Sequence, residues 1–95
     1  MKLTSPSIDE SSIIALKLIS FIASEENRCE RFSALTGMTL QDLKEGAKKP
    51  EFQGFVLEYA LQDESLILEF AAMENLSPHT LVAARHKLPG ATYDF

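Results

Sequence analysis

The stretch LTGMTLQDL, residues 35–43, places a glycine, an apolar residue and a threonine between two helical patterns. Gly37 suits the left-handed conformation that ends many helices, and Thr39 is a preferred N-cap for the helix that follows. Met38 and Leu43 stand at the N′ and N4 positions of that helix, where two apolar side chains can pack as a hydrophobic staple. The stretch therefore predicts a sharp corner between two helices.

The same kind of corner occurs again in MENLSPHTL, residues 73–81. Aligning residues 32–49 with residues 70–87 pairs residues of the same type: Phe32 with Phe70, Gly37 with Asn75, Thr39 with Ser77, and Leu43 with Leu81. Asn follows glycine as the residue best suited to a left-handed position, so the turn chemistry is the same. We predict two similar helical hairpins on one core, with Phe32 and Phe70 as equivalent anchors. Two units are too few for a solenoid.

Capping residues and apolar spacing divide the rest of the chain into short helices. A Ser7/Glu10 capping box, or Ser5 followed by Pro6, starts a first helix that runs to about residue 25. The other predicted helices cover residues 26–36, 40–48, 50 to about 62, 64–74 and 78–88, with one long helix over 51–74 as an alternative to two. Apolar stripes predict the buried faces of the fourth and fifth helices: Phe52, Phe55, Val56, Tyr59 and Ala60, then Leu66, Ile67, Phe70 and Ala71.

No stretch has the pattern of a strand, so the predicted fold class is all-α. We expect a compact irregular or orthogonal bundle of five or six short helices with two similar helix-turn-helix corners. The first helix should be central, because only Lys17 and Ser20 are polar between Ile13 and Ile22. The chain forms one domain, 1–95, with an ordered core over about 7–88 and a loose tail over 89–95.

Composition narrows the classes of function. The chain is 45% hydrophobic, which is typical of a folded domain, and its net charge of −5 disfavours general attraction to nucleic acid or anionic membranes. The apolar run at residues 13–23 is too short to span a bilayer and lacks the basic flank of a signal peptide. A single cysteine, Cys29, fits a reducing compartment. We therefore expect a cytoplasmic protein.

Residues 40–49 also allow an interpretation in which this helix reads DNA. Four outward side chains would contact bases or phosphates: Gln41, Lys44, Lys48 and Lys49. Asp42 and Glu45 share this surface and would repel phosphates, whereas a DNA reader usually carries a basic stripe. A packed corner is the preferred interpretation. A helix-turn-helix regulator using this helix or the last one is the alternative.

The segment 51–74 contains six acidic residues and no basic one. A solvated outer face explains this pattern, but four of the acids could instead form a patch that steers a basic protein partner: Glu58, Asp63, Glu64 and Glu69. The apolar surface of the first helix could also pair with a second copy of the chain, forming a homodimer.

Catalytic and metal-binding patterns are missing from the sequence. His79 and His86 have no Cys, Asp or Glu at a zinc-like spacing, and no phosphate-binding glycine loop or Ser-His-Asp arrangement occurs. We therefore expect no enzyme activity, metal or cofactor, and we favour a non-enzymatic protein-interaction or regulatory module.

Two segments carry a resemblance to a known family: RFSALTGMTLQDLKEGAKKPEF, residues 31–52, and LQDESLILEFAAMENLSPHTLVAARHKL, residues 61–88. The chain resembles, over about residues 13–88, small uncharacterised bacterial proteins, mainly alphaproteobacterial, that are catalogued as a domain of unknown function. The most specific parts are RF-x-AL-x-G and DE-x-L-x-L-x-FA, and Asn75 stands where many members are expected to have glycine. The resemblance implies an all-helical fold and transfers no catalytic residues.

Overall fold

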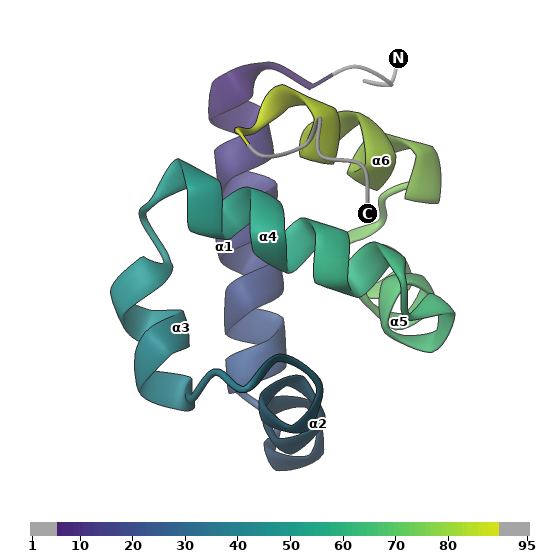
Figure 1. Cartoon of the computed structure of the whole chain (residues 1–95). Helices are drawn as coiled ribbons and strands as arrows, with labels where there is room; N and C mark the ends of the chain where they lie inside the picture. Colours follow the sequence, from purple (N-terminus) through teal and green to yellow (C-terminus); the bar gives the residue numbers. More distant parts are fainter. Residues whose placement is uncertain (1–5, 90–95) are drawn as a thin grey trace.

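The computed structural model describes residues 6–89 and consists there of six helices without a strand (Figure 1). The helices are α1 (Ile8–Ala23), α2 (Glu26–Thr36), α3 (Leu40–Gly46), α4 (Pro50–Leu61), α5 (Glu64–Glu74) and α6 (Pro78–Lys87). The predicted all-α bundle is confirmed. None of these helices combines the length and apolar character that crossing a bilayer requires.

α1 and α4 cross at the centre of the bundle, and the other helices are arranged around them (Figure 1). α1 packs against α2, α3, α4 and α6, while α4 also packs against α5 and α6. Leu18 and Ile22 of α1, Leu57 of α4 and Leu81 of α6 are fully buried in the shared core. The prediction that the first helix is central is therefore correct.

Local capping explains where the helices begin and end. Ser7 and Glu10 form the predicted capping box at the start of α1. Asp63 is extended and accepts a hydrogen bond from the Leu66 N–H, so it separates α4 from α5, and the alternative of one helix over 51–74 is wrong. α1 ends at Ala23 rather than near residue 25, because Glu25 is extended and caps α2 through the Arg28 N–H.

The third helix is shorter than predicted. α3 ends at Gly46 instead of Lys48, and Lys49 is extended as the N-cap of α4. A residue before proline is pushed out of the helical region by the proline ring, so Pro50 imposes this break. Gly46 also lies against the Phe52 ring, where an added Cβ would come within 2.5 Å of the ring carbon Cγ.

Both predicted corners are present. Gly37 has a φ of 79° and Asn75 a φ of 58°, so each chain turn passes through the left-handed region. Equivalent positions in the two corners have equivalent burial: Phe32 and Phe70 are fully buried, as are Leu43 and Leu81, and Met38 and Leu76 are partly buried against the core. The prediction of two equivalent corners with equivalent anchors is confirmed.

The predicted buried stripe of α4 is partly wrong. Val56 and Ala60 are buried as expected, but Phe55 is 38% exposed, and Phe52 and Tyr59 are half-buried. Gln53 and Leu57 are buried in their place, because α4 is covered on two sides by α1 and α6 and its buried face is wider than one stripe. The four residues predicted for the buried face of α5 are all buried.

The broad apolar surface of α1 is mostly core. Ile14, Leu18 and Ile19 are buried, and three large apolar side chains of α1 remain exposed by a third or more: Ile8, Ile13 and Leu16. The surface available for pairing two copies through α1 is therefore narrower than the sequence suggested.

Candidate interaction surface

Two hollows of the described surface lie beside α2, and one of them adjoins exposed apolar side chains. α2 has one buried side chain, Phe32, and packs mainly on α1. The Phe32 ring meets Tyr59 of α4 edge-on, with ring centroids 4.9 Å apart and an interplanar angle of 85°, and meets Phe55 at 6.4 Å. Edge-to-face contacts of this kind are favourable for aromatic rings. One aromatic anchor thus holds α2 beside α4.

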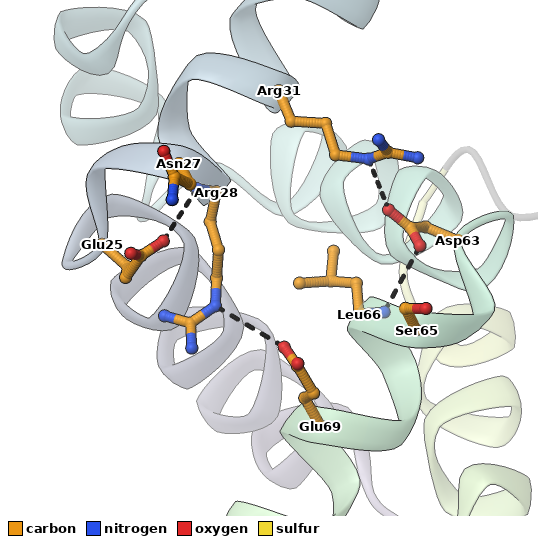
Figure 2. A pocket seen from close by; sticks show the side chains of 8 residues that line it. All are labelled: Glu25, Asn27, Arg28, Arg31, Asp63, Ser65, Leu66 and Glu69. Carbon is orange, nitrogen blue, oxygen red and sulfur yellow. Dashed lines mark hydrogen bonds and ion pairs between the residues drawn. The ribbon is translucent and has the colours of Figure 1, made fainter.

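Two arginines of α2 reach towards α5 (Figure 2). Arg31 Nε donates to Asp63 Oδ2 at 2.9 Å, while the other oxygen of that carboxylate caps α5. Arg28 places its guanidinium carbon 3.7 Å from the centroid of the Phe21 ring, donates to the Phe21 carbonyl and lies 4.0 Å from Glu69. The same acid, Asp63, therefore starts α5 and ties it to α2.

Two hollows flank α2. The polar cleft, about 500 Å³, lies between α2 and α5 and is lined by Glu25, Asn27, Arg28, Arg31, Asp63, Ser65, Leu66 and Glu69. Figure 2 shows the Leu66 side chain in the space between the two arginines. The apolar groove, about 520 Å³, lies between α2 and α4 and is lined by Arg31, Leu35, Thr36, Phe55, Glu58, Tyr59, Gln62 and Asp63. Arg31 and Asp63, which form an ion pair, line both hollows.

The apolar groove combines exposed apolar side chains with a neutral phenol. Leu35 is 63% exposed and Phe55 38% exposed, and both line the hollow. Burial raises the pKa of Tyr59 above its usual value, the Asp63 carboxylate raises it further, and Arg31 partly offsets the increase. The Tyr59 hydroxyl is therefore uncharged at neutral pH and available as a hydrogen-bond donor or acceptor.

A family profile described as a protein of unknown function, DUF3572, matches residues 8–91. The chain belongs to this family. The match covers all six helices and both corners. The resemblance seen in the two sequence segments is thus confirmed as membership of a family of unknown function. Searches among curated proteins and among solved structures found no match.

The four acids of the predicted patch are dispersed among basic partners. Glu58 forms an ion pair with the buried Arg85 of α6, Asp63 pairs with Arg31, and Glu69 approaches Arg28. Glu64 is exposed at the start of α5 and has no ion pair within residues 6–89. These arginines come from α2 and α6, so the acid-rich segment is less negative in the fold than in the sequence. A partner for the patch remains a prediction.

The residues of the DNA alternative lie on and beyond α3. Gln41 and Lys44 are exposed on this seven-residue helix, where Gln41 Nε2 donates to Glu45 Oε2 at 2.9 Å. Lys48 and Lys49 lie after the helix end, in the connection to α4. The four side chains therefore do not share one helix face. Their contact with DNA remains a prediction.

The histidines do not gather with other ligands. His79 and His86 are exposed on α6, and no three Cys, His, Asp or Glu side chains between residues 6 and 89 come together in a way that could hold a metal ion. Sequence reasoning missed the two exposed apolar residues of the groove, Leu35 and Phe55. The helical spacing of Phe55 is that of a core residue, so only its neighbours in the fold reveal that it lines a groove.

Proposed function

We propose that this chain is a non-enzymatic, cytoplasmic protein-interaction module that acts on a partner by binding it at the apolar groove between α2 and α4. The observation that carries the proposal is the exposure of Leu35, 63%, and Phe55, 38%, on the two walls of one hollow. Large apolar side chains around a concavity are typical of sites that bury them against a partner, and aromatic side chains are common binding anchors. The half-buried lone Cys29 fits the cytoplasm.

The polar groups of the groove support binding rather than catalysis. Arg31 pairs with Asp63, and Glu58 pairs with Arg85 and accepts a hydrogen bond of 2.7 Å from Gln62. An active site needs polar groups that converge on a reacting atom, whereas these groups hold one another and brace four helices, α2, α4, α5 and α6. Their arrangement is that of a polar rim around apolar anchors.

The alternative function is DNA binding through α3 or α6. The acids of α3, Asp42 and Glu45, weigh against it, as does the position of two of its lysines outside the helix. A gel-shift assay with duplex DNA at low salt tests it, since binding should weaken when Lys44, Lys48 and Lys49 are neutralised. Self-association through Ile13 and Leu16 of α1 is tested separately by light scattering, where a monomer at high concentration removes it.

Site-specific photo-crosslinking tests the main proposal. A photoreactive amino acid replaces Leu35, and in a matched control it replaces Leu68, an exposed leucine of α5 outside the groove. Irradiation in the native cell should yield a discrete adduct with another protein at position 35 and none at position 68. Equal adducts at both positions, or adducts with nucleic acid alone, would contradict the proposal.

A further inference from the structure

A third hollow, about 530 Å³, lies where the start of α1, the start of α4 and the end of α6 come together. α1 packs on α6, and Figure 1 shows the end of α6, in yellow, beside the start of α1, in purple. The hollow is lined by Ile8, Asp9, Ser12, Pro50, Gln53, Lys87, Leu88 and Pro89. It shares no lining residue with the apolar groove between α2 and α4, so it is a separate surface.

Gln53 is a buried polar residue of this hollow. It is 2% exposed, and its Nε2 donates to the Ala47 carbonyl at 2.8 Å. This bond fixes the orientation of the carboxamide, because the reverse orientation would place two oxygens against each other. The carboxamide oxygen, Oε1, is buried and has no hydrogen-bond partner within residues 6–89. Folded proteins pair nearly all such atoms, so this oxygen requires a donor.

The other polar side chains of the hollow are also unpaired. Asp9, Ser12 and Lys87 form no side-chain hydrogen bond or ion pair within residues 6–89. Asp9 lies in the first turn of α1 and Lys87 in the last turn of α6, where the helix dipoles suit their charges. The dipoles explain these two residues but supply no donor for Gln53. The hollow therefore differs from the apolar groove, whose carboxylates are paired with arginines.

From this juxtaposition we infer that the hollow binds a small zwitterion, a free α-amino acid with an apolar side chain. An ammonium group has three N–H donors, and three unpaired acceptors line the hollow: the Gln53 oxygen, the Asp9 carboxylate and the Ser12 hydroxyl. Asp9 and Ser12 lie three residues apart on α1, a spacing that makes them neighbours on the helix surface. The Lys87 ammonium receives the carboxylate of the ligand.

The remaining lining residues select the apolar side chain of the ligand. Ile8 is 63% exposed, and Pro50, Leu88 and Pro89 complete the apolar wall. Binding sites for small molecules commonly combine such a wall with a few polar groups that fix orientation. An inorganic anion fits less well, because it would face the Asp9 carboxylate and the Gln53 oxygen. A simple amine leaves Lys87 without a counter-charge.

Nuclear magnetic resonance titration of the full-length chain tests this site. L-leucine, L-methionine and L-phenylalanine serve as probes, and at least one should cause saturable shifts in residues that line the hollow. The side-chain NH₂ resonances of Gln53 should move with them, since its oxygen accepts from the ligand. Two analogues of leucine dissect the recognition: 4-methylpentanoic acid lacks the ammonium, and 3-methylbutylamine lacks the carboxylate. Each should bind at least about tenfold more weakly than leucine.

Matched variants locate the contacts. Asp9→Asn should weaken the best amino acid about tenfold, whereas Glu26→Gln, an exposed acid in the first turn of α2 outside the hollow, should leave its affinity unchanged. Lys87→Met should weaken it about fivefold, and the exposed Lys48→Met should not. Gln53→Met removes the acceptor but also the bond to Ala47, so a dispersed spectrum must first show that this variant folds.

The outcomes decide between a ligand and bound water. Absence of saturable shifts with all three amino acids would overturn the site and leave water as the donor to Gln53. Equal binding of leucine and its two analogues, or no effect of Asp9→Asn, would overturn the zwitterion as ligand. Shifts that leave the Gln53 NH₂ resonances unchanged would place the ligand elsewhere and contradict the site. Photo-crosslinking at position 35 is independent of these results, because Leu35 does not line this hollow.

Discussion

The two corners of the molecule, residues 35–43 and 73–81, both turn through a left-handed residue but use different hydrogen bonds. In the first, the Gly37 N–H donates to Ser33 O, and the Met38 N–H donates to the Thr36 hydroxyl, which itself donates to Phe32 O. In the second, the Asn75 and Leu76 N–H groups both return to backbone carbonyls of α5. A left-handed residue therefore determines the turn, and the surrounding bonds can vary.

The caps after the two turns also differ. Thr39 and Asp42 form a reciprocal capping box, with hydrogen bonds of 2.9 and 3.1 Å. Ser77 accepts from the His79 N–H at 3.0 Å and is followed by Pro78, which has no N–H to satisfy. Each corner nevertheless buries the same leucine position, Leu43 or Leu81. The two corners therefore share the burial of this leucine, although their caps differ.

The aromatic anchors should give the largest effects. Phe32→Ala and Phe70→Ala should each lower the free energy of unfolding by about 3–5 kcal/mol, because both rings are fully buried and each packs on other aromatic rings. Urea denaturation of the purified variants measures this. A near-neutral effect of one variant beside a large effect of the other would mean that the two corners are not equivalent.

The basic residues after the two corners should differ sharply in how much they contribute to the free energy of unfolding. Arg85 is buried against Glu58, so Arg85→Met leaves a partly buried carboxylate without its partner and should cost about 2–3 kcal/mol. Lys48→Met, at an exposed position after the first corner, should change stability by less than about 0.5 kcal/mol. Adding Glu58→Gln to Arg85→Met should recover part of the loss. Equal costs for Arg85→Met and Lys48→Met would refute this distinction.

The left-handed residues should respond to substitution according to backbone preference alone. An added Cβ at Gly37 meets no atom within 4 Å, so Gly37→Ala should cost about 1–2 kcal/mol from conformation only, and Gly37→Asn clearly less. Asn75→Gly should be tolerated within about 0.5 kcal/mol. Thermal unfolding of the three variants gives this order. A Gly37→Ala variant as stable as the parent would show that the turn does not need a left-handed residue.

Substitutions at the caps should give the smallest losses of stability, and the size of the loss should differ between the two corners. Thr39→Ala removes one half of a reciprocal box and should cost about 1 kcal/mol. Ser77→Ala should cost about 0.5 kcal/mol, because Pro78 already fixes the first helical residue. The comparison needs both variants in one denaturation series. A larger loss for Ser77→Ala than for Thr39→Ala would reverse the expected order.

The sequence alone predicted the helices, the two left-handed turns and the buried anchors. These features depend on residues within a few positions of one another: Ser7 with Glu10, Gly37 with the helix before it, Asp63 with Leu66. Local backbone chemistry acts over that distance, so the pattern is readable without the fold. The misplaced end of α3 has a local cause as well, the proline at position 50.

The candidate site depends on contacts that no local pattern contains. Phe55 has the spacing of a core residue, and only the position of α2 leaves it at a groove beside Leu35. Within segment 51–74, Glu58 and Asp63 are paired with arginines from α6 and α2, which lie far away in sequence. Backbone preferences act between neighbours, whereas exposure and ion pairing depend on how distant helices pack. The sequence therefore determined the helices and corners, and the tertiary structure decided which side chains are exposed and which are paired.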